Sequence, residues 1–335
     1  MTQTPGRTPA DPAGASGPGP TQAGSTPDPA RPGSTVVGMD IGGSKTRALL
    51  IRDGVVVDEQ QAGSANTQSV SEQTAVESLR DLFAALGDPR PDLVIAGSGG
   101  IDTAEDAQRL RDLIAPHAPG AEVVAVHDTR LTLAAGRTST GVAVIAGTGS
   151  VAWGRNDAGR TARAGGWGYL LGDEGSGYWL AREAARATLH RFNLDQPVSS
   201  LGAGLLEACG LTDPEQLIAH FHFGTDRRYW AARSPVVYAA ADEGDRDALR
   251  IIQIGAEHLA DLATQVARQL PVTGPIVLGS GIGMHQPRTQ RAFRALMVDR
   301  GYADVRVLDQ EPVHGVLQLL ADRAAGIALE SYTES

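Results

Sequence analysis

The chain has 335 residues and a formal net charge of −10, which argues against nucleic acid or an anionic membrane surface as a partner. Its single cysteine, Cys209, excludes an internal disulfide, a four-cysteine zinc site and an iron–sulfur cluster built by one chain. No run of about 18 apolar residues occurs, so no membrane-spanning helix is expected. We therefore expect a cytoplasmic globular protein of about two domains.

Residues 1–34 are rich in proline and glycine and poor in apolar side chains. Such a segment cannot bury enough apolar surface to offset the entropy of ordering, so it predicts a disordered tail outside the fold.

A first domain is predicted over residues 35–137. It begins with three strands, joined by a glycine-rich turn and a two-residue hairpin, and continues with alternating helices and strands. The predicted elements are strands Thr35–Ile41, Thr46–Arg52 and Val55–Gln61, helix Val70–Leu86, strand Leu93–Ala96, helix Ala104–Ile114, strand Ala121–Val126 and a helix opening at Thr129–Ala135.

A second domain, predicted over residues 138–330, starts with the same order of strand, glycine-rich turn, strand, turn and strand. This repetition predicts an α/β protein of two similar domains with a ligand cleft between them. The predicted elements are strands Gly141–Ala146, Val151–Arg155 and Arg160–Ala164, an insertion of helices at 174–191, 213–223, 234–240 and 244–270, strands Ile276–Leu278 and Val305–Leu308 around a further helix, and a last helix Pro312–Leu329.

The two glycine-rich turns are the first candidate sites. One follows Asp40 and contains Gly42, Gly43, Ser44 and Lys45, the only lysine of the chain; the other contains Gly147, Thr148 and Gly149. Backbone amides of such turns can point at phosphate oxygens, and an aspartate at the end of the preceding strand suits a hydrated Mg²⁺. The alternative is a pair of ordinary hairpins.

Asp128 follows a predicted buried strand and precedes a predicted helix. A carboxylate at this position suits either a helix N-cap or a general base that accepts a proton from a hydroxyl group.

Two further glycine-rich segments contain candidate binding residues. In Gly165–Gly177, Trp167 could pack on a sugar ring and Asp173 could accept hydrogen bonds from sugar hydroxyls, although Asp173 could instead cap the following helix. Gly279-Ser280-Gly281-Ile282-Gly283 follows a strand, where a nucleotide often binds in an open sheet and where a plain strand–helix turn is the alternative.

Taken in this order, the motifs resemble the N-acetylglucosamine kinase branch of the BadF/BadG/BcrA/BcrD ATPase-type proteins, within the actin-like ATPase and sugar-kinase superfamily. The resemblance covers roughly residues 36–326. Its most specific parts are AGTGSVAWGRNDAGRTARAGGWGYLLGDEGSG at 146–177 and DIGGSKT at 40–46, followed by the Asp128 element.

The resemblance implies two actin-like (ribonuclease H-like) domains and phosphorylation of the 6-hydroxyl of N-acetylglucosamine by ATP and Mg²⁺, in a protein that is usually a homodimer. Asp128 would be the general base and Asp40 would position the metal. The turns, with Gly42, Gly43, Ser44, Lys45, Gly147, Thr148 and Gly149, would contact the phosphates. Gly244, Gly279 and Ser280 would lie near the nucleoside, and the sugar would contact Asn66, Gly166, Trp167, Gly168 and Asp173.

One alternative to this reading stays open at this point, and three others are disfavoured. Glucosamine or N-acetylmuramic acid could be the substrate of the same fold. A reductase-activating ATPase needs more cluster cysteines than Cys209 supplies, and the sugar kinases with a cysteine-rich zinc motif are excluded for the same reason. A sugar-sensing regulator without catalysis is disfavoured, because no DNA-binding segment is visible and Asp128 is retained.

Overall fold

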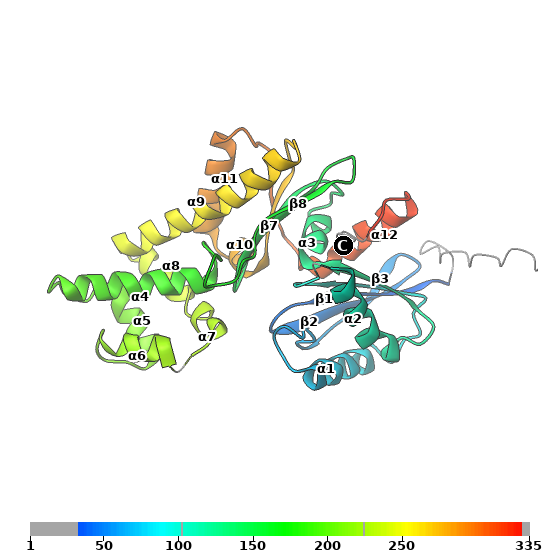
Figure 1. Cartoon of the computed structure of the whole chain (residues 1–335), viewed down its shortest axis with the longest axis horizontal. Coiled ribbons are helices and arrows are strands. Elements are labelled where there is room, and N and C mark those ends of the chain that lie inside the picture. The colour runs from blue at the N-terminus through cyan, green and yellow to red at the C-terminus, as the bar shows by residue number, and fades with distance from the viewer. Residues whose placement is uncertain (1–32, 102, 224, 330–335) are drawn as a thin grey trace, which may run out of the picture.

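The computed structural model describes residues 33–101, 103–223 and 225–329 (Figure 1). The predicted disordered tail lies outside the described residues, apart from Gly33 and Ser34. Two five-stranded mixed sheets form the framework. Within the described part of the chain, no helix is long and apolar enough to cross a membrane.

The first sheet has the strand order β3-β2-β1-β4-β5. Strands β1, β2 and β3 form an antiparallel meander, whereas β4 and β5 are parallel to β1. The strands are β1 (Thr35–Ile41), β2 (Lys45–Arg52), β3 (Val55–Gly63), β4 (Leu93–Ser98) and β5 (Glu122–His127), and the helices between them are α1 (Glu72–Ala85) and α2 (Ala104–Ile114), with a 3₁₀ turn at Ala115–His117.

The second sheet has the order β10-β9-β6-β7-β8, the same arrangement of a meander followed by parallel strands. Its strands are β6 (Gly141–Ala146), β7 (Ser150–Arg155), β8 (Thr161–Gly165), β9 (Ile276–Gly279) and β10 (Val305–Val307). The repeat expected from the sequence is therefore confirmed as a repeat of sheet topology.

Long helices separate β8 from β9. They are α4 (Gly177–Asn193), α5 (Ser200–Cys209), α6 (Gln216–Phe223), α7 (Arg227–Ala231), α8 (Pro235–Asp242) and α9 (Arg246–Gln269), and α10 (Ser280–His285) and α11 (Pro287–Asp299) follow β9. Figure 1 shows α4 to α8 at the end of the molecule away from α1 and α2. Helices α5, α7 and α10 are not among the predicted elements; α7 and α10 have only five and six residues, too few turns for a periodic pattern.

Alternating residues of β1 enter two different cores. Val37 packs with α1 and α2 on one face, and Val36 packs on the other face with α3 (Asp128–Ala135) and α12 (Gly315–Ala324). The C-terminal helix thus returns to the first sheet. The last helix is shorter than the predicted Pro312–Leu329, because Pro312–His314 form a 3₁₀ turn and α12 ends at Ala324.

Helix α3 contacts both sheets. Leu131 belongs to the core under the first sheet, whereas Leu133 packs with Val277 and Trp153 of the second. The first residue of this shared helix is Asp128, so the position of that carboxylate depends on both halves of the chain.

Candidate functional site

The carboxyl ends of β1, β4 and β5 meet at one edge of the first sheet. Asp40 of β1 pairs with Gly97 of β4, and Gly97 pairs with Val126 of β5, two residues before Asp128. Because parallel strands end at the same edge, Asp40 and Asp128 come close together although they lie far apart in the sequence.

The pKa of Asp40 is raised to about 7. Burial is the largest cause, followed by the negative charges of Asp128 and Glu311, while Lys45 and Arg47 act in the opposite direction. Asp40 therefore lies among carboxylates whose mutual repulsion a cation would relieve.

This carboxylate environment fits the Mg²⁺ expected from the sequence. Within the described residues, no three histidine, cysteine, aspartate or glutamate side chains converge closely enough to form a metal-ligand cluster. Mg²⁺ keeps several of its waters in proteins and binds through one or two carboxylates, so Asp40 could hold it in that way.

Asp128 presents an oxygen that lacks a hydrogen-bond donor. Its Oδ1 atom is buried and accepts no hydrogen bond in the described structure, although it lies 2.8 Å from Nδ1 of His127. The same nitrogen accepts the backbone N–H of Thr129 at 3.2 Å. Oδ1 of Asp128 therefore has the His127 imidazole beside it and can still accept a proton or a hydrogen bond.

The structure contradicts the N-cap alternative for Asp128. His127 is the N-cap of α3 and accepts the Thr129 amide, so Asp128 is the first helical residue and its side chain is not used for capping. The Asp128 carboxylate therefore does not cap this helix.

Asn66 lies beside Asp128. Its Nδ2 donates to the carbonyl oxygen of Gly99 at 3.4 Å, and a Cβ on Gly99 would lie only 3.1 Å from Oδ2 of Asp128. The loop that contains Asn66 is tied to the first glycine turn, because Ser64 Oγ donates to the carbonyl of Gly42 at 2.8 Å. The structure therefore groups Asp40, Asn66 and Asp128 around this turn.

The first glycine turn is bordered by charged side chains. The amide of Gly42 donates to the carbonyl of Lys45 at 3.0 Å, and the side chain of Ser44 is exposed. Glu311 forms ion pairs with Lys45 at 3.7 Å and with Arg47 at 3.1 Å. Lys45 is thus held by a half-exposed carboxylate that an anionic ligand could replace.

The second glycine turn is supported by buried groups instead. Asp173 is 4 % exposed, and its Oδ1 accepts the backbone N–H of Ser150 at 3.1 Å. Burial raises the pKa of Asp173, while the Ser150 amide and Arg227 oppose that rise. A Cβ on Gly149 would lie 2.9 Å from either Asp173 oxygen, so glycine is required there.

Two non-glycine residues with positive φ flank this second turn. Asp173 has φ 60° and Ser280 has φ 67°, and Ser280 Oγ reaches to 2.5 Å from where a Cβ of Gly147 would lie. Such backbone conformations are uncommon outside glycine and cluster at functional sites. They bring the predicted Gly279-Ser280 turn into contact with Gly147, whereas Thr148 at the tip of the turn stays exposed.

The structure also contradicts the helix-capping alternative for Asp173. Ser176 caps α4 through a hydrogen bond to the Trp179 amide, while Asp173 supports the second turn. Sequence inspection gave no signal for this contact, because Asp173 and Ser150 are separated by a strand, a turn and a second strand.

Trp167 lies on the loop between β8 and α4, with Gly166 and Gly168 on either side. It is 59 % exposed, and the guanidinium of Arg163 lies 5.0 Å from its ring centroid. No hydrogen bond of the described residues joins Gly166, Trp167 or Gly168 to Asp128 or Asn66. The structure therefore does not bring these two groups of predicted sugar contacts into direct contact.

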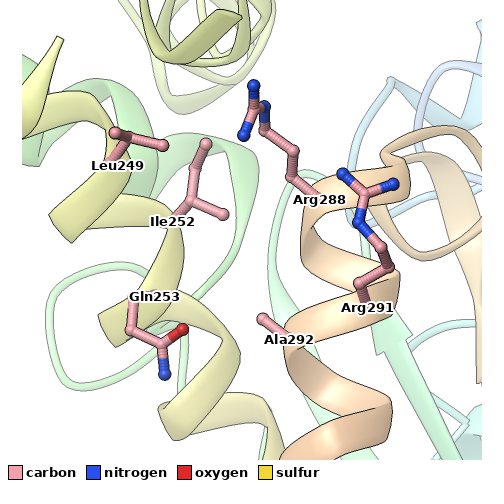
Figure 2. Close-up of a pocket in the computed structure, with 6 residues that line it drawn as sticks. All are labelled: Leu249, Ile252, Gln253, Arg288, Arg291 and Ala292. Atoms are coloured by element: carbon pink, nitrogen blue, oxygen red, sulfur yellow. The ribbon is translucent and has the colours of Figure 1, made fainter. Parts of the chain in front are cut away.

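A hollow of about 250 Å³ lies between α9 and α11 (Figure 2). It is lined by Leu249, Ile252 and Gln253 of α9 and by Arg288, Arg291 and Ala292 of α11. Gly244 lies two residues before α9, but neither it nor any other predicted site residue lines this hollow. The hollow is thus separate from the carboxylates around Asp40.

Two residues near the first turn were not identified from the sequence. Glu311 pairs with Lys45 and Arg47, and Arg228 of α7 donates from Nη2 to the carbonyl oxygen of Ser69 at 3.4 Å. Both lie more than 150 residues after the first turn, and no local pattern connects either residue to it.

The fold and the two glycine turns define a protein of the actin-like ATPase class, an α/β architecture with two mixed sheets. Residues 37–310 match the BadF/BadG/BcrA/BcrD ATPase family, and the chain belongs to that family.

Two curated relatives are kinases of amino sugars. The chain is 33% identical over 233 residues to an N-acetylmuramic acid/N-acetylglucosamine kinase of Clostridium acetobutylicum, covering 67% of this chain and 76% of the relative. It is 29% identical over 254 residues to an N-acetyl-D-glucosamine kinase of Dictyostelium discoideum, covering 70% of this chain and 79% of the relative.

Solved structures agree with this assignment. A protein described as a candidate N-acetylglucosamine kinase, from Chromobacterium violaceum, superposes with a TM-score of 0.67 at 25% identity, covering 86% of this chain and 99% of the other. A ROK family glucokinase from Streptomyces griseus gives a TM-score of 0.59 at 17% identity, covering 88% and 100%, which indicates a shared fold.

Proposed function

We propose that this protein is an ATP-dependent amino-sugar kinase that phosphorylates the 6-hydroxyl of N-acetylglucosamine, with Asp128 as the general base. The observation that carries the proposal is the buried Oδ1 of Asp128, which accepts no hydrogen bond in the described structure and lies next to Asp40 and Asn66. The family and its kinase relatives support the same activity.

In the proposed reaction, the sugar oxygen attacks the γ-phosphorus of ATP and forms the new P–O bond. The bond between that phosphorus and the β,γ-bridging oxygen breaks, ADP leaves, and Asp128 accepts the proton of the attacking hydroxyl. Such a transfer depends mainly on in-line placement and charge neutralisation, with an aspartate to receive the proton.

We assign the phosphates to the two glycine turns. Ser44 and Thr148 are the exposed residues of these turns, with Gly42, Gly43, Lys45, Gly147 and Gly149 beside them. A bound Mg²⁺ at Asp40 would neutralise phosphate charge. Gly244, Gly279 and Ser280 would lie near the nucleoside.

We assign the sugar to Asn66 on one side and to Gly166, Trp167 and Gly168 on the other. Asp173 would contribute Oδ2, since its Oδ1 already accepts the Ser150 amide. The two groups would meet when two domains, residues 35–137 and 138–330, close over a cleft and exclude water, which limits hydrolysis of ATP. A cytoplasmic homodimer is part of this proposal.

The test is ADP release from Mg-ATP with N-acetylglucosamine, glucosamine, N-acetylmuramic acid, glucose and no sugar. We expect ADP release to depend on N-acetylglucosamine. Nuclear magnetic resonance of the product should then show the phosphate on O6. Hydrolysis that ignores every sugar would contradict the proposal, as would a product phosphorylated at another oxygen.

A further inference from the structure

Arg228 approaches the first glycine turn from another part of the chain. Its Nη2 donates to the carbonyl oxygen of Ser69, and Nη2 lies 3.4 Å from where a Cβ of Gly43 would be. Ser69 Oγ lies 3.2 Å from the same point. The guanidinium is thus in contact with both the turn and the loop that contains Asn66.

The helix that carries Arg228 is firmly anchored. Asp226 caps α7 by accepting the amides of Arg228 and Tyr229, and Trp230 is 1 % exposed in the core. The hydroxyl of Tyr229 is 2.7 Å from Nε2 of His220. Because the helix is held in place, the guanidinium can reach only a limited set of positions. Recognition of a ligand needs such positioning, whereas a side chain that is merely solvated does not.

The charge of Arg228 is not neutralised by its surroundings. No carboxylate in residues 33–101, 103–223 and 225–329 forms an ion pair with it, and its hydrogen bond goes to a neutral carbonyl at the long limit of 3.4 Å. A guanidinium presents five N–H donors in a planar fork that matches the oxygens of a carboxylate or phosphate. A ligand oxyanion would satisfy these donors better than a single carbonyl does.

We propose that Arg228 forms an oxyanion site where the first glycine turn meets the loop of Asn66 and Ser69. The inference rests on the proposed kinase function and adds a residue from α7 to its substrate contacts. Two ligand groups could supply this oxyanion: a phosphoryl group of ATP, or the carboxylate of an acidic amino sugar such as N-acetylmuramic acid. A cationic amino sugar such as glucosamine would be disfavoured by the same charge.

The experiment compares the full-length protein with Arg228→Gln and Arg228→Lys, and with Arg250→Gln as control. Arg250 is exposed on α9 and makes no ion pair or hydrogen bond within the described residues. One arm measures binding of a non-hydrolysable ATP analogue and of adenosine by calorimetry. The other measures kcat/KM for N-acetylmuramic acid and for N-acetylglucosamine.

If the oxyanion is a phosphoryl group, Arg228→Gln weakens the ATP analogue about 10- to 100-fold and leaves adenosine unchanged. If it is the sugar carboxylate, the same change lowers kcat/KM for N-acetylmuramic acid by a similar factor and spares N-acetylglucosamine. Arg228→Lys should restore part of either effect, because it keeps the charge but loses the planar fork.

Two ratios decide the outcome: the affinity for the ATP analogue relative to adenosine, and kcat/KM for N-acetylmuramic acid relative to N-acetylglucosamine. If Arg228→Gln changes neither ratio, the oxyanion site is refuted. This holds even if the variant has a lower melting temperature, because a purely anchoring role would affect both members of each ratio equally. The two proposals fail separately. A wild-type protein that phosphorylates no amino sugar refutes the kinase, whereas the nucleotide arm still tests Arg228. An active kinase with unchanged ratios refutes only the oxyanion site.

Discussion

The two glycine turns occupy equivalent places in two sheets of the same topology, yet they are held in different ways. The first turn is bordered by charged, partly exposed side chains, Lys45, Arg47 and Glu311. The second is fixed by the buried carboxylate of Asp173 and by Ser280, which lies against Gly147. A repeated fold can thus combine one turn whose charges can change partners with one that is fixed in advance.

This difference separates two tasks in the proposed kinase. The carboxylate of Asp128, whose Oδ1 accepts no hydrogen bond, and that of Asp40, whose pKa is raised to about 7, both lie near the first turn, where proton transfer and metal binding are assigned. At the second turn the buried carboxylate of Asp173, whose pKa burial also raises, accepts a backbone amide instead. The following changes test whether chemistry belongs to the first turn and rigidity to the second.

Asp128→Asn is expected to have the largest effect. The amide keeps the size of the side chain but cannot accept the proton of the sugar hydroxyl, so kcat should fall about 10²- to 10⁴-fold. Steady-state kinetics measures this loss, and calorimetry should show that sugar binding is largely retained. A kcat near that of the wild type would remove Asp128 from the mechanism.

Asp322→Asn should strongly destabilise the contact between α3 and α12. Asp322 accepts Nη2 of Arg130 at 2.6 Å, and both side chains are buried, so the change leaves a buried arginine without its counter-ion. Breaking such a pair costs about 3–5 kcal/mol. Urea denaturation measures the loss, with the exposed Asp304→Asn as control.

The same variant tests whether the two halves depend on each other. Asp128 begins the helix that also contains Arg130, so we expect kcat to fall in Asp322→Asn even where the protein remains folded. Full activity in the folded variant would mean that the α3–α12 contact does not position Asp128.

Asp173→Ala should weaken the second turn. The Ser150 amide would lose its buried acceptor, which costs about 1–3 kcal/mol of unfolding free energy. Because the turn is assigned to phosphates, binding of the ATP analogue should also weaken. Asp157→Ala in the exposed turn between β7 and β8 is a matched control, and equal effects of the two changes would contradict the supporting role.

Asp40 predicts a smaller, pH-dependent effect on stability. Its pKa in the folded protein is about 7, above the ordinary value of 3.8, so the folded state binds more protons between these limits. The unfolding free energy contributed by Asp40 is therefore fully present below about pH 4 and is lost as the pH rises through about 7. Asp40→Asn should reduce this slope in denaturant titrations at several pH values.

An unchanged slope in Asp40→Asn would show that burial and the neighbouring carboxylates do not raise the pKa of Asp40 in the folded protein. The same titrations on Asp173→Ala provide the comparison between the turns, because the pKa of Asp173 is also raised by burial. We expect Asp40→Asn to change the pH dependence of the unfolding free energy more than Asp173→Ala does. The negative charges of Asp128 and Glu311 add to the effect of burial in disfavouring the ionised form of Asp40.

The sequence alone determined most of the local architecture. Alternation of apolar residues and turns at glycine pairs predicted the strands of both sheets within one or two residues, because these signals lie within a few neighbouring positions. The repeated order of strand, glycine turn and strand also predicted the repeated topology. The DIGGSKT and GGWGYLLGDEGSG segments indicated the family to which the chain belongs.

Only the tertiary structure decided which groups are free and which are occupied. Asp128 and Asp173 both resembled helix caps in the sequence, but His127 and Ser176 cap those helices. Oδ1 of Asp128 accepts no hydrogen bond, whereas Oδ1 of Asp173 accepts a distant amide. Glu311 and Arg228 reach the first turn across long sequence separations. Local sequence patterns report on backbone geometry, whereas side-chain partners depend on how distant segments pack.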